Sequence, residues 1–543
     1  MAYGYRAVER DQPFLLPPDM RDWLPAGHMA WFVIDAVAVL DLSKFTVRAG
    51  PARSAAGRAG YDPRMLLALL VYGYARGVRS SRKIERACTE DVAFRVICAQ
   101  DAPDHATLAR FRRRHFASEQ AVGDLFAQVL AIAAAAGLGR LGLVAVDGTK
   151  MAASASKGAN RTERTLAELA AAVLAEAEET DAAEDALFGD ARGDELPAEL
   201  ADPATRAERI AAALAQLAAE REAAQAQRDQ QAGEYLGKTA AGKRPPGRPP
   251  ASAGVSAAQL RLDQALATQQ AKIVAWEQAE AAKRAATGTG QRAHRPVPPG
   301  EHFAVRRAAA ALAKAKARAG AAGRSQGRTN AAGSDAGPAA NITDPHSRLM
   351  PVRGGGFIQG YNAQAAHSAD GLCLGGLVTT QTTDFASFGP LLEQITAASG
   401  ILRAHARGPL RRLKARTGTV LADAGYCSQA NLTCPGPGRL IATGSRRHLA
   451  AATAGPASPA HRADGRALSA AAAAMATQIT TYPGRIIYKQ RSPIAETPFG
   501  HRKHNHGFRA FSMRGLARVS GEWTFCNTVE NLLKIHATGW QPA

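Results

Sequence analysis

Apolar positions recur at helical spacing through the first quarter of the chain. Three segments show this pattern, each with an apolar face and a polar face: residues 62–77, 80–97 and 104–116. Asp62 and Asp104 stand where N-cap residues belong, and Pro63 fits the first helical position because its φ angle is already helical. Residues 1–135 are therefore predicted to form an all-helical domain.

Further along, apolar runs of strand length replace the helical pattern. Two of them, "GGGFIQGYNAQAAHS" and "GLCLGGLVTTQTTD", are separated by the turn dipeptide Asp370-Gly371 and predict a hairpin. A helix, "FASFGPLLEQITAAS", and the short strands "GTVLADAGY" and "GRLIATG" follow. The earlier run "GLVAVDGTK" repeats the pattern of "GTVLADAGY", because each leads an apolar strand into one acid, Asp147 and Asp423.

The region between these strands has a different composition. From about residue 160 to residue 340, Ala, Glu, Gln, Lys and Arg dominate, which predicts a long helical insert. Inside it, "GKRPPGRPP" at residues 242–250 resembles the Gly-Arg-Pro core of minor-groove hooks, with a Pro-rich linker as the alternative. A Pro- and Ala-rich stretch near residues 446–475 is predicted to be a loop without fixed order.

The order of the predicted elements indicates a fold class. It runs strand, insert, strand, strand, helix, strand, short strand, helix, which is the order of an RNase H-like α/β domain whose first and fourth strands lie side by side. We therefore predict an all-helical, helix-turn-helix-like N-terminal domain, the first part of the RNase H-like catalytic domain, the helical insert and the remainder of the catalytic domain: residues 1–135, 136–159, 160–340 and 341–543.

The charge of the chain indicates a partner. Lys and Arg number 67 against 47 Asp and Glu, a formal charge of +20 at pH 7, which favours a polyanion such as nucleic acid. Four arginines gather on the third predicted helix, which follows another helix as in a helix-turn-helix: Arg110, Arg112, Arg113 and Arg114. We predict that they contact double-stranded DNA. A solvated basic face and a basic structural protein are the alternatives.

The cysteines and the apolar runs indicate the compartment. Six cysteines form no C-x-x-C pair, which argues against a zinc ribbon and a disulfide scaffold. The first residues lack the apolar region of a secretory signal. The most apolar stretch, residues 129–146, is broken by Gly137, Gly139 and Arg140, so it does not suit a bilayer span of about 20 residues. We expect a cytoplasmic, nucleoid-associated bacterial protein with no membrane contact.

The two acids at the strand ends predict a chemistry. Adjacent parallel strands lie about 4.8 Å apart, so acids at their carboxyl ends meet at one edge of the sheet. Carboxylates so placed suit a pair of Mg²⁺ ions, the arrangement that cuts and rejoins phosphodiesters. The alternative is that each strand ends at an acid because Asp and Gly favour turns.

The C-terminal segment "YKQRSPIAETPFGHRK" supplies a third carboxylate. Tyr488, Arg491, Glu496 and Lys503 resemble the Y-R-E-K signature of bacterial insertion-sequence transposases. Four more segments match in the same order: "VAVDGTK", "TDPHSRLM…GGFIQGYNAQAA", "ADAGYCS" and "HGFRAFSMRGLARVSGEWTFCNTVENLLKI". The chain therefore resembles the DDE transposases, most closely the insertion-sequence group numbered eleven eighty-two.

The resemblance implies both activity and site residues. Asp147, Asp423 and Glu496 are expected to be the catalytic residues and the Mg²⁺ ligands, with Mn²⁺ as a substitute. Arg491 and Lys503 are expected to bind phosphate groups, and Tyr488 to contact the DNA strand end or pack in the core. The protein is expected to bind terminal inverted repeats, to cleave and transfer DNA strands, and to act as a homodimer or larger assembly. An RNase H-like nuclease and a catalytically inactive, transposase-derived DNA-binding protein are the alternatives.

One departure from the signature bears on the third acid. The family places three residues between Arg and Glu, whereas four separate Arg491 from Glu496 here. Glu530 is the competing acid, with an i,i+4 surface pair to Lys534 as its simpler explanation. Two further acids, Asp344 and Asp384, are possible neighbours of the site. For Asp384 an N-cap role on the following helix is expected.

Overall fold

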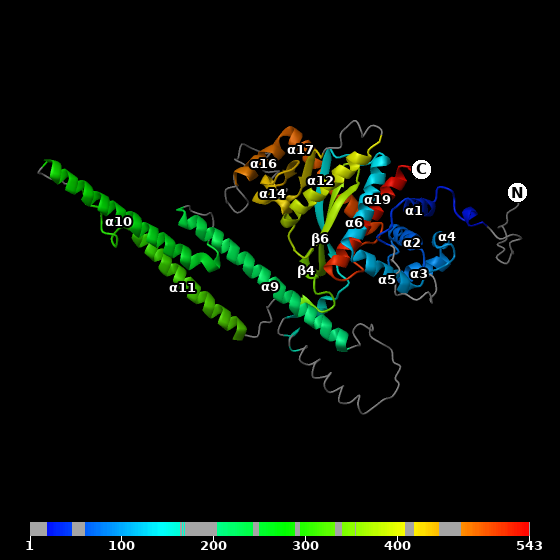
Figure 1. Ribbon diagram of the computed structural model, residues 1–543, viewed down its shortest axis with the longest axis horizontal. Helices are drawn as coiled ribbons and strands as arrows, with labels where there is room; N and C mark the ends of the chain where they lie inside the picture. Colours follow the sequence, from blue (N-terminus) through cyan, green and yellow to red (C-terminus); the bar gives the residue numbers. More distant parts are fainter. Residues whose placement is uncertain are drawn as a thin grey trace, which may run out of the picture. The chain divides into compact units, whose positions relative to one another are not determined.

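A computed structural model describes residues 19–45, 60–162, 165, 166, 168, 203–242, 249–287, 294–331, 339–352, 355–407, 417–444 and 469–541. The chain divides into two compact units. Residues 1–160 and 341–543 form unit 1, and residues 161–340 form unit 2. Both units are drawn in Figure 1. The chain is thus mixed α/β with a majority of helix.

Helices dominate the N-terminal part of unit 1. They are α1 (Met29–Ala38), α2 (Pro63–Ala75), α3 (Ser81–Glu90), α4 (Val92–Ile97), α5 (His105–Phe116) and α6 (Glu119–Ala135). Asp62 and Asp104 cap α2 and α5 as predicted, each accepting a hydrogen bond from a backbone N–H of the first turn. The predicted helix over residues 80–97 is wrong in one respect. Asp91 takes an extended conformation and caps α4, which separates α3 from α4.

The N-terminal helices belong to the same compact unit as the sheet. The helices α2, α5 and α6 pack against the C-terminal helix α19 (Leu516–Ala537). A Cβ on Gly521 would lie 2.0 Å from the backbone oxygen of Phe116, so only glycine allows this approach. Tyr74 also donates a hydrogen bond of 2.8 Å to the buried Glu522 carboxylate. The first and last parts of the chain therefore share one core.

The sheet of unit 1 has the strand pairing predicted from the sequence. Its strands are β1 (Leu143–Ala152), β4 (Arg348–Pro351), β5 (Phe357–Ser368), β6 (Cys373–Thr379), β7 (Thr419–Ala422) and β8 (Gly438–Ile441). β5 pairs antiparallel with β1 and forms the predicted hairpin with β6. β7 pairs parallel with β1 on its other side, and β8 pairs parallel with β7. The first and fourth predicted strands, β1 and β7, are therefore neighbours, as expected.

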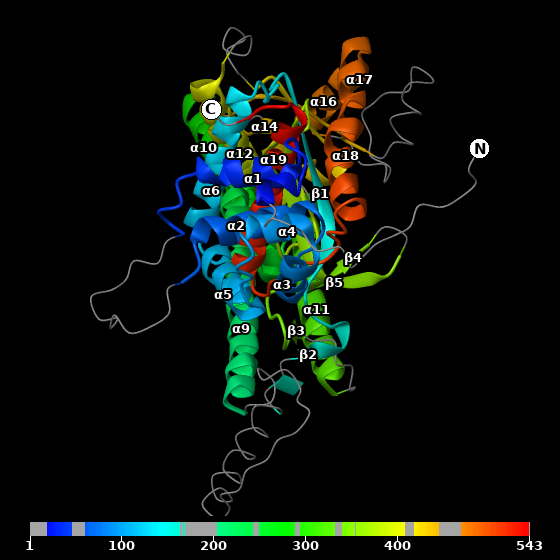
Figure 2. The ribbon, with the colours of Figure 1, turned by 90° about the vertical axis from the view of Figure 1, so that its right-hand side faces the viewer.

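Helices cover both faces of this sheet. One face carries Val144, Val146 and Val420 and packs in the main core with α6, α12 (Phe388–His405) and α19. The other face carries Ala145 and Leu421 and packs against α16 (Ala470–Thr480) and α18 (Arg491–His504). Figure 2 shows α18 running beside β1. Alternate residues of each strand therefore face different helical layers.

The C-terminal helices correct one prediction. The loop predicted near residues 446–475 lies outside the described residues up to residue 468, but α16 begins at Ala470 and buries Met475. A proline normally interrupts a helix, but α18 continues through the buried Pro498. Between α16 and α18 lies α17 (Tyr482–Lys489).

Unit 2 contains the predicted long helices. They are α9 (Pro203–Ala240), α10 (Gly254–Thr287) and α11 (Phe303–Ala331), and α10 packs with both others. The hook-like segment at residues 242–250 lies outside the described residues from 243 to 248. Short strands β2 (Asn160–Thr162) and β3 (Ala339–Asn341) form a separate two-stranded sheet. Within the described residues, no helix is both long and apolar enough to cross a bilayer.

Candidate active site

Asp147 and Asp423 lie at equivalent positions on two neighbouring strands. The last aligned pair of β1 and β7 is Ala145 with Leu421. Each aspartate stands two residues further along its chain, so both belong to the face that packs against α18. The negative charge of Asp423 adds to the rise in the pKa of Asp147.

The two backbones hold their aspartates in different ways. β1 does not end at Asp147, as the sequence suggested, but continues to Ala152 because β5 pairs with it along the whole strand. Asp423 does follow the end of β7 and caps the 3₁₀ turn Ala424–Tyr426, accepting a hydrogen bond of 2.9 Å from Gly425 N–H. One acid therefore sits inside a ladder and the other on a turn.

The Asp147 carboxyl group is in an unfavourable environment for its negative charge. Burial raises its pKa to about 6, and Asp423 adds to this rise. Arg491 opposes the rise, as does a hydrogen bond of 2.8 Å from Gly148 N–H. An additional positive charge at this edge would stabilise the ionised carboxylate.

Arg491 links the first and third predicted acids. It is the first residue of α18, and its guanidinium group donates to Asp147 Oδ2 at 3.1 Å and to Glu496 Oε1 at 2.8 Å. The Arg491 side chain is only 11% exposed, whereas that of Glu496 is 46% exposed. The extra residue in the signature therefore does not separate Glu496 from the site, because the long arginine side chain spans the first turn of α18.

Tyr488 and Lys503 lie against the same two strands. The Tyr488 hydroxyl donates to the backbone oxygen of Ala422, next to Asp423, at 3.1 Å. The Lys503 ammonium group donates to the Thr149 hydroxyl and approaches the backbone oxygen of Lys150 at 3.4 Å. All four signature residues therefore contact β1, the residue before Asp423, or one another.

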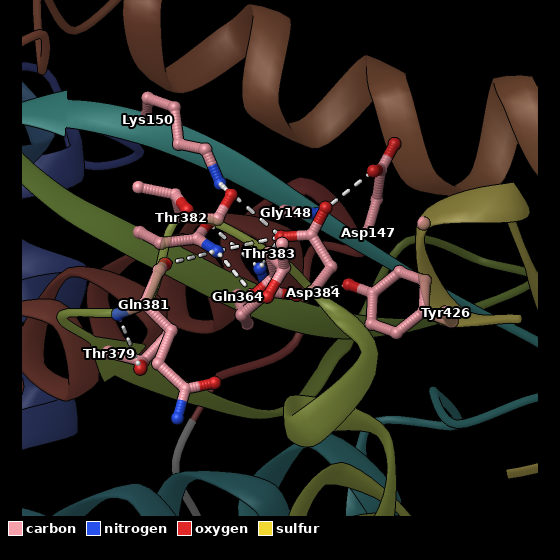
Figure 3. Close-up of polar contacts among 12 residues, drawn as sticks. Asp147, Gly148, Lys150, Gln364, Thr379, Gln381, Thr382, Thr383, Asp384 and Tyr426 are labelled. Atoms are coloured by element: carbon pink, nitrogen blue, oxygen red, sulfur yellow. Dashed lines mark hydrogen bonds and ion pairs between the residues drawn. The ribbon is translucent and has the colours of Figure 1, made fainter. Parts of the chain in front are cut away.

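Asp384 was named as a possible neighbour of the site, but its expected role as a helix cap is wrong. Its side chain makes no capping hydrogen bond. Its Oδ1 instead accepts from Asn362 at 2.7 Å and Gln364 at 2.8 Å, and Lys150 lies 3.4 Å away (Figure 3). Asp147 and Lys150 are three residues apart on β1, so their side chains lie on opposite faces of the sheet. The sequence therefore indicated that Lys150 pairs with an acid other than Asp147, and that acid is Asp384.

Asp384 also approaches the pair of aspartates. A Cβ built on Gly425 would lie 3.0 Å from Asp384 Oδ2 and 3.0 Å from Asp423 Oδ1, so these two oxygens are at most twice that distance apart. The buried Tyr426 ring lies beside them, and its hydroxyl donates to Gln364 (Figure 3). Burial raises the Tyr426 pKa well above its usual value, and the negative charges of Asp147 and Asp384 add to that rise.

The residues at this edge fit a divalent cation with oxygen ligands. Asp147 and Asp423 present carboxylates on one face of the sheet. The positively charged guanidinium group of Arg491 lies between Asp147 and Glu496 and donates a hydrogen bond to each. Burial, the main cause of the raised pKa of Asp147, disfavours its ionised form, and a bound cation would offset that effect. Hard carboxylate oxygens are the ligands that Mg²⁺ and Mn²⁺ take in proteins.

Two other acids that were considered do not join this site. Asp344 is fully buried, and its carboxylate accepts hydrogen bonds from the Tyr361 hydroxyl at 2.7 Å and from Gly515 N–H at 3.2 Å. Glu530 is buried too, so the predicted surface pair is wrong. Its oxygens lie 2.9 Å from His501 Nδ1 and 3.9 Å from Arg502 Nε.

The arginine cluster on α5 is divided between surface and interior. Arg110, Arg113 and Arg114 are exposed, as expected for DNA contact. Arg112 is not on that face, because only 6% of it is exposed. Its guanidinium group donates to the backbone oxygen of Arg79 and to the Ser512 hydroxyl, the latter at 3.1 Å. Arg112 therefore ties α5 to the C-terminal segment.

Two family models match parts of the chain. The family described as "Transposase domain (DUF772)" matches residues 18–114, the segment of α1–α5. The family described as "Transposase DDE domain" matches residues 459–536, which include Glu496 and the rest of the Y-R-E-K residues. No curated protein and no solved structure matches the chain.

Proposed function

We propose that this chain, which the two matched domains indicate to be a transposase of the DDE type, recognises the terminal inverted repeats of an insertion sequence and cleaves and transfers DNA strands there. The finer assignment is to the Y-R-E-K transposases of the group numbered eleven eighty-two, with an RNase H-like catalytic domain. The observation that supports the proposal is that Arg491 bonds both Asp147 and Glu496, while Asp423 follows the strand that pairs with β1.

In this proposal the three acids hold Mg²⁺, with Mn²⁺ as a substitute. Bound metal supplies an activated water or 3′-hydroxyl nucleophile and charge stabilisation at the phosphorus. Asp147 and Asp423 keep their oxygens on one face because their backbones belong to neighbouring strands. Glu496, whose side chain is 46% exposed on a helix, would complete the set if Arg491 exchanged its carboxylate contacts for phosphate oxygens.

The remaining signature residues position DNA. Arg491 suits bidentate binding of a phosphate, and Lys503 places a second positive charge beside β1. Tyr488 donates to Ala422 at the end of β7, next to Asp423, and there it would contact a strand end. Two DNA ends must be held together for transfer, so we propose a homodimer or larger assembly in the DNA complex. The cytoplasmic nucleoid is the corresponding location.

The test compares nicking and joining of labelled DNA ends, taken from the sequence that flanks the gene, in the presence of Mg²⁺. Asp147→Asn and Asp423→Asn keep side-chain size but remove charge, so each should abolish both reactions, and Glu496→Gln should do the same. Glu393→Gln, an exposed acid on α12, is the matched control and should keep full activity. Normal cleavage by either aspartate variant would contradict the proposal.

The same assay separates the alternatives. Metal-dependent nicking without joining of pre-cut ends would indicate an RNase H-like nuclease. End binding without nicking by the unaltered protein would indicate a transposase-derived DNA-binding protein that has lost catalysis.

A further inference from the structure

Three ligand-type atoms converge outside the acidic site. His501 Nδ1 lies 2.9 Å from Glu530 Oε1 and 3.2 Å from His506 Nε2, and all three atoms lie within 4.8 Å of one another. His501 is on α18, His506 is on the turn that follows it, and Glu530 is on α19. The cluster therefore joins the end of the helix that carries Glu496 to the C-terminal helix.

Protons alone satisfy this triangle poorly. If His501 Nδ1 carries a hydrogen, it must share that single hydrogen between Glu530 and His506. If it carries a lone pair, that lone pair faces a carboxylate oxygen. A cation at the centre would instead meet one lone pair from each of the three atoms.

A cation at this position would displace one proton. The hydrogen bond to Glu530 raises the pKa of His501, and the same bond helps to lower the pKa of Glu530 against the effect of burial, so these two groups share a proton as a charged pair. A backbone hydrogen bond at Ala75 also holds the His506 ring, the kind of second partner that orients metal-binding histidines. The three atoms can therefore bind a cation when the proton shared by His501 and Glu530 leaves.

We propose that His501, His506 and Glu530 form a binding site for Zn²⁺, distinct from the Mg²⁺ site of the acidic edge. Two imidazoles and one carboxylate are a common zinc ligand set, whereas Mg²⁺ selects oxygen ligands. With zinc–ligand bonds of about 2.0–2.2 Å, tetrahedral ligand atoms lie roughly 3.4 Å apart, close to the separations around His501. His501 and Glu530 line an open pocket, which gives an ion access from solvent.

The proposed zinc site would act on the position of α18. It would fix the turn after Lys503 against α19 and so hold the helix on which Glu496 lies. Two cations, Arg502 and Lys534, lie near Glu530 and oppose the metal charge, so we expect micromolar rather than tighter affinity.

The experiment is a calorimetric titration of the full-length, chelator-treated protein with Zn²⁺. Asp147→Asn and Asp423→Asn are present in every sample, so that the acidic edge does not contribute. We expect one equivalent of Zn²⁺, an affinity at least about tenfold weaker in His506→Gln, and an unchanged affinity in His504→Gln. His504 is exposed on the same helix and outside the cluster, which makes it the matched control.

Three outcomes overturn the site: no stoichiometric binding by the parent protein, equal binding by His506→Gln, or equal loss of binding in His504→Gln. Glu530→Gln is a second variant, and circular dichroism of each variant separates loss of a ligand from loss of the fold. The DNA-nicking assay in Mg²⁺ is independent of this titration, so failure of the zinc site and failure of the transposase proposal are distinguishable.

Discussion

The ionised side chain of Asp147 lowers the stability of the fold. Its folded pKa of about 6 exceeds the ordinary value of 3.8, so the folded state binds the proton more tightly than the unfolded chain does. The ionised group therefore destabilises the fold, and the free energy of unfolding falls as pH rises from about 4 to about 6.

The corresponding prediction concerns Asp147→Asn without divalent metal. At pH 8 the variant should be more stable than the unaltered protein by up to about 3 kcal/mol, since one pKa unit equals about 1.4 kcal/mol. Near pH 3 the difference should nearly vanish, because the carboxyl group is then mostly protonated in both states. Urea unfolding at the two pH values measures it. A variant that is less stable at pH 8 would contradict burial as the dominant influence on Asp147.

Asp384 is expected to matter for rate rather than for DNA binding. Asp384→Asn keeps the side-chain shape but removes the charge that holds Lys150 and Gln364. Gln364 in turn accepts from Tyr426, which lies on the turn that Asp423 caps. A hydrogen bond to a charged group contributes about 1.5–3 kcal/mol, so cleavage should slow by roughly 10- to 100-fold. Single-turnover nicking measures the effect, with end binding as the control. An unchanged nicking rate would exclude this role for Asp384.

At the scale of the element, α5 combines two kinds of arginine. Arg113→Ala should weaken DNA binding and reduce the slope of log K against log salt by about 0.9, because one phosphate contact is lost. Arg112→Ala should instead lower the melting temperature, since it leaves the Arg79 carbonyl and Ser512 without their partner. Salt-dependent binding and thermal unfolding of both variants test this. Equal effects of the two substitutions on both measurements would contradict the division.

The elements show which features a sequence can predict. The starts of α2 and α5 were predictable because a capping aspartate acts within three residues of itself. The strand pairing was predictable as well, because turn residues and apolar runs define a short list of topologies. Local signals were also available for the break at Asp91, which caps α4.

The site was predictable in its residues but less so in its contacts. The resemblance placed Asp147, Asp423 and Glu496 together, and the strand register accounts for the first two. The burial of Arg112 and Glu530 depends on partners hundreds or tens of residues away, Ser512 and His501, which no local pattern encodes. The passage of α18 through Pro498 likewise depends on tertiary packing, which outweighs local helix propensity.

At the scale of the whole molecule, the insert is expected to be dispensable for folding of unit 1. Asn341 donates to Asn160 at 3.2 Å, so the two chain ends of unit 1 already meet where unit 2 begins and ends. Replacing residues 163–338 by a short Gly-Ser linker should therefore keep unit 1 folded. Thermal unfolding followed by near-UV circular dichroism measures this. A fall of more than about 10 °C, several kcal/mol for a protein of this size, would show that unit 1 depends on unit 2.

In the sequence, unit 2 lies between β1 and both of its partner strands, and this order affects folding of the newly made chain. Val144 pairs with Ser368 and with Val420, so β1 leaves the ribosome long before either partner strand exists. At roughly 5–20 residues per second, synthesis of the intervening chain takes on the order of 15–50 s. Throughout that interval an apolar strand lacks both neighbours, and chaperones that bind exposed apolar segments have time to act on it. Slower translation would lengthen this exposure and increase aggregation.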